Sequence, residues 1–257
     1  MLRDLAERWS RDRVVRRRLP PELGGHALFV SPDAALKLWR RDLESADPLL
    51  LQLAAELAQP GDTVWDVGAN VGLFAFAAAF AAGPGGRVVA IEADDWLAGL
   101  VRRSARTAAP VYARVDVLAA AVADRPGIVE LCIAARGRAG NHLRCVAGST
   151  QTGGHRETRN VVAVTLDSLL DAFPPPRLLK IDVEGAEALC LRGAERLLAE
   201  VRPLIVCEVA AENEAEVGER LCRHGYTLLD AALPADRRTP RATPAWNTLA
   251  VPGRPAA

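Results

Sequence analysis

The chain has 257 residues, of which 50% are hydrophobic, so it can bury a full core without disulfides or a structural metal. Lysine plus arginine equals aspartate plus glutamate at 32 each, so no overall charge favours nucleic acid as a partner. The longest apolar run, Val71 to Ala82, is too short to span a membrane, and the charged first residues are unlike a signal peptide.

The cysteines and histidines bear on the compartment and on metal binding. The five cysteines are scattered without a C-x-x-C pair, which is typical of reduced thiols, so we expect a cytoplasmic protein. The four histidines lack the close spacings that zinc ligands need, so no structural zinc site is expected.

Residues 1–59 are expected to form an N-terminal extension packed on the main domain. They contain a polar helix, a short β-like piece from His26 to Val30, and an amphipathic run from Pro48 to Ala58. A basic run, Arg11 to Arg18, is interpreted as a solvated face, with contact to an acidic partner as the alternative.

A strand, a glycine turn, a helix and a second strand follow one another between Val64 and Asp94. Residues 64–67 suit a buried strand, and the turn Gly68 to Gly72 lets the backbone approach a ligand closely. Leu73 to Ala82 predicts an almost wholly apolar helix that ends at a Gly-Pro pair. Arg87 to Ile91 is the second strand, and Glu92 at its end can accept hydrogen bonds from both hydroxyls of a ribose. The pattern indicates a cradle for a nucleotide cofactor.

The glycine spacing of this turn indicates which cofactor binds. A dinucleotide site needs G-x-G-x-x-G, whereas Asp66 through Gly72 reads D-x-G-x-N-x-G and fits S-adenosylmethionine, whose methionine end is a zwitterion. We expect Asp66 to meet the ammonium group and the turn amides near Asn70 and Gly72 to meet the carboxylate. The alternative is a tight turn with Asp66 as a cap. Asp94 and Asp95 are N-cap candidates for the next helix.

The middle of the chain predicts an arm and a loop. A helix from Trp96 to Ala108 and a segment from Tyr112 to Ala123 precede a hairpin arm, Gly127 to Ala134. Ala135 to Asn160 is rich in glycine and arginine, and we interpret it as a disordered segment or a substrate lid. Strand character resumes in Val161 to Thr165, and a short helix begins at Leu166.

A charged row stands in a second apolar strand, Leu178 to Val183. Lys180, Asp182 and Glu184 project to one face, where a buried parallel strand should be apolar, so the row is expected to be functional. Glu187 follows at the start of a helix that ends near Ala199, and it should share a face with Glu184. The alternative is an ion pair of Lys180 with a purely structural role.

The last part of the chain continues the alternation of strands and helices. Pro203 to Val209 is a strand that contains Glu208, and a helix from about Glu212 to His224 follows. Tyr226 to Asp230 and Asn247 to Val251 are terminal strands, which brings the countable strands to seven. The loop Pro234 to Pro244, with Arg237, Arg238 and Arg241, is expected to lie on the surface.

Six segments in this order resemble the FkbM-type family of S-adenosylmethionine-dependent methyltransferases. They are PGDTVWDVGANVG, VVAIEAD, VTLDSLL, LLKIDVEGAEALCLRGAERLL, PLIVCEV and WNTLAVP, between Pro60 and Pro252. The resemblance implies an α/β fold with a Rossmann-like seven-stranded class I methyltransferase sheet, an antiparallel last strand, and a methyltransferase domain over 60–257. Carried over by position, Asp66, Gly68, Asn70, Gly72 and Glu92 match the cofactor motif, and Lys180, Asp182, Glu184, Gly185 and Glu187 match the second motif.

The resemblance also implies methylation of a hydroxyl on a small molecule such as a sugar or a natural product. Asp182 or Glu184 would be the general base, with Lys180 beside them. Alternatively, Asp182, Glu184 and Glu208 would hold magnesium, which would acidify the hydroxyl. His142 and His155 are further candidate bases on the loop. Two other classes are weighed, an NAD-dependent oxidoreductase, which the G-x-N-x-G spacing disfavours, and a non-catalytic S-adenosylmethionine-binding module, which would be expected to have a degenerate cofactor loop.

Overall fold

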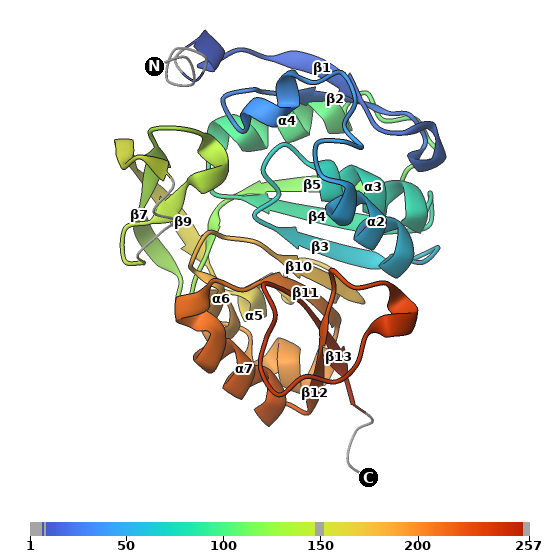
Figure 1. The fold of residues 1–257 in the computed structure, drawn as a ribbon, viewed down its shortest axis with the longest axis vertical. Helices are drawn as coiled ribbons and strands as arrows, with labels where there is room; N and C mark the ends of the chain where they lie inside the picture. Colours follow the sequence, from blue (N-terminus) through green and yellow to red (C-terminus); the bar gives the residue numbers. More distant parts are fainter. Residues whose placement is uncertain (1–6, 8, 147–151, 254–257) are drawn as a thin grey trace.

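A central sheet of seven strands organises the computed structural model, which describes residues 7, 9–146 and 152–253. Its strands are β3 (Thr63–Val67), β4 (Arg87–Glu92), β5 (Arg114–Ala119), β10 (Leu178–Ile181), β11 (Leu204–Glu208), β12 (Tyr226–Asp230) and β13 (Asn247–Pro252). They lie in the order β12-β13-β11-β10-β3-β4-β5 (Figure 1), and β13 runs antiparallel to both of its neighbours. The strand order reverses between β3 and β10, and open α/β sheets bind ligands at such a point.

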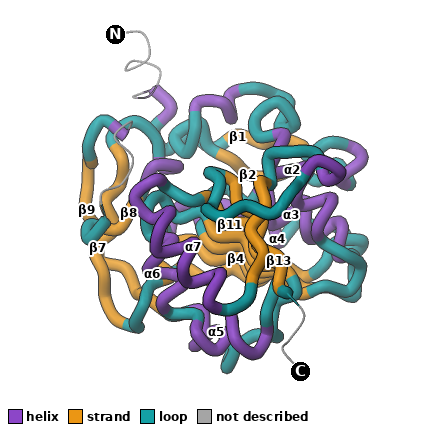
Figure 2. Tube along the Cα trace, turned by 60° about the horizontal axis from the view of Figure 1, so that its bottom comes forward, coloured by secondary structure: helices purple, strands orange, loops and turns teal. Residues whose placement is uncertain are grey.

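Helices cover both faces of this sheet (Figure 2). One face carries α2 (Pro48–Leu57), α3 (Leu73–Ala82) and α4 (Asp95–Ala105), and the other carries α5 (Leu166–Leu169), α6 (Glu187–Arg192) and α7 (Glu214–Arg223). The apolar side chains of the strands alternate between the two resulting cores, with Val64 in one and Trp65 in the other. Helix α3 is buried between the sheet and α2, which explains why nearly all of its residues are apolar.

A second sheet of four strands stands beside the main one (Figure 1). It is made of β6 (Ala121–Val122), β7 (Gly127–Ala134), β8 (His142–Leu143) and β9 (His155–Val164), in the order β6-β9-β7-β8. The predicted arm, β7, is confirmed with its bounds. The prediction of a loop or lid over Ala135 to Asn160 is wrong for its last part, since β9 begins at His155 and pairs with β7. Residues 147–151 of the predicted loop lie outside the described residues.

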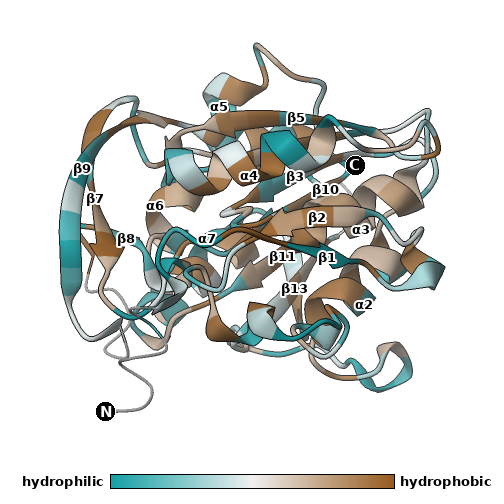
Figure 3. Cartoon of the chain, turned by 90° about the horizontal axis from the view of Figure 1, so that it is seen from above, coloured by the Kyte–Doolittle hydropathy of each residue, from teal (hydrophilic) through white to brown (hydrophobic). Residues whose placement is uncertain are grey.

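The reason for this difference lies in the chemistry of β9. Its first residues, HRETRN, are hydrophilic (Figure 3), so a search for apolar alternation finds only the last part of the strand. Backbone hydrogen bonds join β9 to β7, and the hydrophilic side chains are compatible with a strand here because one face of an antiparallel sheet can remain in water.

The N-terminal residues form a hairpin that packs on α4. Strand β1 (Val15–Arg18) pairs with β2 (Ala27–Val30), and the backbone N–H of Phe29 donates to Ser104 Oγ over 2.9 Å. The Tyr112 hydroxyl accepts from the N–H of His26 at 3.2 Å and donates to the carbonyl of Leu23 at 3.0 Å. Apolar residues of this segment belong to the same core cluster as α2 and α3.

Several element bounds differ from the predictions for identifiable reasons. Helix α6 ends at Arg192 and not near Ala199. At the next residue, Gly193, the carbonyl accepts from the N–H of Asp167 at 2.9 Å, and an added Cβ would be 2.4 Å from the carbonyl oxygen of Ala123. A π-helical turn, Leu197–Val201, follows. Strand β10 ends one residue before Asp182. The bounds of α3 and β12 are confirmed.

One arginine of the loop 234–244 is not on the surface. The side chain of Arg238 is 4% exposed and forms a salt bridge with Glu56 of α2. A guanidinium group can be buried when a carboxylate pairs with it, which the loop sequence alone does not reveal.

No helix in the described part of the chain is long and apolar enough to cross a membrane.

Candidate active site

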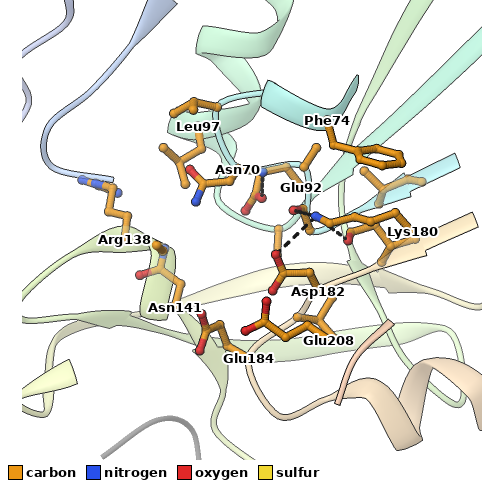
Figure 4. A pocket seen from close by; sticks show the side chains of 18 of the residues that line it. Asn70, Phe74, Glu92, Leu97, Arg138, Asn141, Lys180, Asp182, Glu184 and Glu208 are labelled. Carbon is orange, nitrogen blue, oxygen red and sulfur yellow. Dashed lines mark hydrogen bonds and ion pairs between the residues drawn. The ribbon is translucent and has the colours of Figure 1, made fainter. Parts of the chain in front are cut away.

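A cavity of about 250 Å³ opens at the carboxyl ends of β3, β4, β10 and β11, where the strand order reverses. Its wall has contributions from the turn after β3, from the strand ends, from the second sheet and from the N-terminal segment. Figure 4 shows the polar side chains that face one another across it. Of the predicted site residues, the cavity is lined by Gly68, Asn70, Glu92, Lys180, Asp182 and Glu184.

The glycine turn brings backbone to the cavity. Gly68 has φ +73°, and an added Cβ would lie 1.7 Å from the carbonyl oxygen of Asp182, so only glycine fits between the two strand ends. Gly72 does not line the cavity. Its φ of +87° sets the start of α3, and its Cβ would lie 3.1 Å from the ring of Phe76. Gly72 therefore shapes the helix start, whereas a contact with the ligand was expected.

Glu92 and Asn70 present hydrogen-bonding groups to this space. The Oε2 of Glu92 accepts from the N–H of Asn70 at 2.7 Å, and Oε1 accepts from the N–H of Asp94 at 2.9 Å. Each oxygen keeps a further acceptor position. Burial raises the pKa of Glu92 to about 7. The Oδ1 of Asn70 is buried without a hydrogen-bond partner among the described residues. These acceptors fit the ribose hydroxyls and the ammonium group of S-adenosylmethionine.

Asp66 lies beneath the cavity, so the expected contact with an ammonium group is not available in this geometry. It is fully buried, does not line the cavity, and lies 3.1 Å from the Nζ of Lys180. The register pairs Lys180 with Asp66 on neighbouring strands, so both side chains point to the same face. Asp66 thus stabilises Lys180 from below.

Lys180 connects the cofactor turn with the charged row. Its Nζ donates to the carbonyl of Gly68 at 2.7 Å and lies 3.4 Å from Asp182 Oδ2 (Figure 4). Burial lowers its pKa, but the carboxylates of Asp66 and Asp182 outweigh that and raise it. Lys180 is therefore a fixed cation that cannot serve as a base near neutral pH.

Three carboxylates gather at the ends of β10 and β11. Those of Asp182, Glu184 and Glu208 lie near one another on the same side of the cavity (Figure 4). Burial raises the pKa of Glu184 to about 8, with Asp182 and Glu208 adding repulsion. Burial, then Asp182, raises the pKa of Glu208 to about 7. Glu208 was predicted only as a metal ligand, although acids at the ends of adjacent parallel strands meet at one sheet edge and so indicate a shared site.

Glu187 is not part of the cavity wall, and the prediction that it shares a helix face with Glu184 is wrong. Glu184 has φ +52° and Gly185 has φ +99°, so the chain reverses between the two acids before α6 begins. Glu187 is 2% exposed.

No group of three histidine, cysteine, aspartate or glutamate side chains in the described ranges could hold a metal ion, so the magnesium alternative has no ligand set in this conformation.

Arg138, Asn141 and His142 line the cavity opposite the carboxylate cluster. Arg138 donates to Asp33 Oδ2 at 2.8 Å and to Asp94 Oδ2 at 2.6 Å, and Asn141 donates to Asp94 at 3.0 Å. His142 also lines the cavity, but His155 does not. Lys37 and Asp47 of the N-terminal segment form an ion pair of 2.9 Å at the rim. Sequence reasoning missed Arg138, because its partners are distant in the chain.

The fold and the cavity together define a class I S-adenosylmethionine-dependent methyltransferase. The chain belongs to the FkbM family of these enzymes, because the model of the methyltransferase FkbM domain matches residues 66–228. Family membership overturns the two alternative classes, the NAD-dependent oxidoreductase and the non-catalytic binding module.

The individual relatives that follow are each less than 30% identical to this chain. The chain is 26% identical over 200 residues to the hexuronic acid methyltransferase AglP of Haloferax volcanii, and the match covers 75% of each chain. Among solved structures, precorrin-6y C5,15-methyltransferase from Geobacter metallireducens matches at a TM-score of 0.45 with 13% identity, covering 80% of this chain and 84% of that one. Methyltransferase FkbM from Methylobacillus flagellatus matches at 0.44 with 17% identity, covering 78% and 50%.

Proposed function

We propose that the chain is an O-methyltransferase that acts on a hydroxyl of a small polyhydroxylated acceptor, such as a sugar or a natural product. The observation that supports this best is the carboxylate cluster of Asp182, Glu184 and Glu208 at the cofactor cavity. A neutral alcohol must lose its proton as it attacks, so the enzyme needs a base beside the acceptor.

Glu92, Asn70 and Gly68 would hold the cofactor. Glu92 would accept hydrogen bonds from the ribose hydroxyls, and the unpartnered Oδ1 of Asn70 would accept one from the ammonium group. The backbone at Gly68 can approach the ligand closely. S-adenosylmethionine, when bound, supplies the electrophilic methyl group, and these residues align it for in-line transfer.

Glu184 is our candidate for the general base. In the described part of the chain no side chain donates a hydrogen bond to it, whereas Asp182 lies 3.4 Å from the Lys180 ammonium. A base is most effective when its pKa lies near the working pH, and that of Glu184 is about 8. Lys180 would orient Asp182 through this ion pair. Glu208, with a pKa of about 7, is the second candidate.

The acceptor would enter between the carboxylate cluster and the rim. Lys37, Asp47 and His142 come from outside the core sheet, so they would contact the acceptor and select it. AglP is named as a hexuronic acid methyltransferase, and its similarity to this chain supports a sugar acid as one acceptor to examine.

All five cysteines are free thiols in the structure, which supports a cytoplasmic location.

Methyl transfer from labelled S-adenosylmethionine to a panel of sugars, sugar acids and hydroxylated natural products tests the proposal. We expect a methyl ether as the product, and turnover lowered about a hundredfold in Glu184→Gln with cofactor affinity retained. Indifference to a chelator would support the direct base. Loss of activity with the chelator and recovery with magnesium would favour the metal alternative, and full activity in Glu184→Gln would refute Glu184 as the base.

A further inference from the structure

The candidate base occupies an unusual backbone conformation. Glu184 has φ +52° and the next residue, Gly185, has φ +99°. A non-glycine residue persists in the left-handed region only where its surroundings hold it there. The turn places the Glu184 carboxylate in the cavity while the chain continues into α6 behind it.

Two side chains outside the cavity wall hold this turn. Glu187 Oε1 accepts from the N–H of Gly185 at 2.9 Å. Asn213, in the short 3-10 helix Ala211–Asn213 after β11, donates from Nδ2 to the carbonyl of Gly185 at 2.8 Å and to Glu187 Oε2 at 2.6 Å. Both polar groups of the Gly185 backbone are therefore bound by one side-chain pair, and that pair is joined by its own hydrogen bond.

We propose that Glu187 and Asn213 are positioning residues that lock the turn at Gly185 and thereby hold the Glu184 carboxylate in place for proton removal. This inference rests on the proposed function, in which Glu184 is the base. The lock joins the loop after β10 to the loop after β11, so it fixes Glu184 relative to Glu208, which ends β11.

The lock has a consequence that can be observed at Glu184 itself. Burial is the main cause that raises its pKa to about 8, and the carboxylates of Asp182, Glu208 and Glu187 add to it, while Lys180 acts in the opposite direction. If the turn relaxed, the carboxylate would move toward water and away from these acids. Its pKa would then fall toward the ordinary glutamate value.

Carbon-13 NMR of the full chain labelled at the glutamate side-chain carboxyl, with S-adenosylhomocysteine bound, measures this without an acceptor. The Glu184 signal is identified by its absence in Glu184→Gln. We expect its titration midpoint to move toward acid by at least one pH unit in Asn213→Ala, and turnover of the best acceptor in the panel to fall about tenfold with unchanged affinity for S-adenosylhomocysteine. Glu187→Gln, which puts an amide against the Asn213 amide, should shift the midpoint in the same direction.

Asp167→Asn is the matched control, because Asp167 also accepts backbone N–H groups, those of Arg196 and Leu197, but away from the cavity. It should lower the melting temperature and leave the Glu184 midpoint unchanged. If Asn213→Ala behaves in the same way as this control, the lock is only structural and the inference is wrong. If Glu184→Gln retains full turnover, the proposed base is wrong, and this outcome is separate from the NMR result.

Discussion

The carboxylate of Glu92 has two roles: it holds the glycine turn, and it presents hydrogen-bond acceptors to the cavity. It accepts the N–H groups of Asn70 and Asp94, which fixes the glycine turn relative to the end of β4. The same oxygens line the cavity, where they can accept further hydrogen bonds. Loss of this side chain should therefore affect ligand binding both directly and through the turn.

For Glu92→Ala we expect S-adenosylhomocysteine to bind about 10- to 100-fold more weakly, since charged hydrogen bonds contribute roughly 1.5 to 3 kcal/mol. Isothermal calorimetry measures the affinity. Glu130→Ala, in the exposed part of β7, is the control and should leave the affinity unchanged. An unaltered affinity in Glu92→Ala would mean that the carboxylate is only a strand-end acid.

The raised pKa of Glu184 predicts how the stability of the folded chain depends on pH. Its pKa is raised from 4.5 to about 8 in the folded chain, so between these values the folded state binds more protons than the unfolded state. The stability that this group contributes is fully present below pH 4.5 and is lost as the pH rises through 8. Glu184→Gln removes the ionisation, so it should raise the melting temperature at pH 9 relative to the parent, by about 2 to 4 °C for a gain of the order of 1 kcal/mol.

Differential scanning calorimetry at pH 5 and pH 9 checks this expectation. The difference between variant and parent should be larger at pH 9 than at pH 5, and Glu130→Gln should show no such dependence. A difference that is the same at both pH values would contradict a raised pKa at Glu184.

At the scale of elements, the close contact between the turn after β3 and the end of β10 determines the geometry of the site. The Gly68 backbone lies against the Asp182 carbonyl, and Lys180 bridges the same two strand ends. The cofactor turn and the carboxylate cluster are therefore parts of one packed unit, so a change in one will displace the other.

Gly68→Ala should disrupt this unit, because the added Cβ overlaps a backbone atom and the φ of +73° is unfavourable for alanine. We expect a fall in melting temperature of about 5 to 10 °C, from a strain of roughly 2 to 3 kcal/mol, together with loss of S-adenosylhomocysteine binding. Gly99→Ala in α4 is the control. Its Cβ meets nothing within 4 Å, so it should be neutral or stabilise the helix by about 0.5 to 1 kcal/mol. Equal effects of the two substitutions would refute the close-approach argument.

At the scale of the whole molecule, ion pairs at Arg138 join three distant segments. Arg138, in the 3-10 turn between β7 and β8, is paired with Asp33 of the N-terminal segment and with Asp94 after β4. Arg156 of β9 adds a further contact with Asp33 at 2.8 Å. The N-terminal segment and the second sheet are thereby fixed over the cavity that they help to line.

Arg138→Met should cost about 3 to 5 kcal/mol of unfolding free energy, because the buried carboxylate of Asp94 loses its nearest cation and that of Asp33 keeps only Arg156. Urea denaturation measures the loss. Arg144→Met, whose side chain is 60% exposed in its pair with Glu130, is the control and should change stability by less than about 0.5 kcal/mol. Similar losses in both variants would show that the Arg138 network contributes no more than a surface pair.

Much of the main sheet was predictable from local pattern. Apolar runs, glycine stops and strand-end acids identified α3, β4, β12 and the charged row that begins in β10 and continues beyond it, because each of these signals is carried by neighbouring residues. The hydrophilic β9 and the early end of α6 were missed. In β9 the strand is defined by its backbone hydrogen bonds to β7, and the break after α6 falls at Gly193, which contacts Asp167 and Ala123 from distant segments.

The sequence by itself determined the class of the protein and the two motifs around which the site is built, since a cofactor turn and a strand-end acid need fixed spacings along the chain. Only the tertiary structure decided which residues of those motifs face the ligand. Asp66 lies under the cavity and its neighbour on the adjacent strand, Lys180, lines it, while Glu187 lies behind it. Arg138 reaches the cavity and Asn213 reaches the turn behind it from other segments, and such contacts depend on strand order and packing, which leave no local pattern in the sequence.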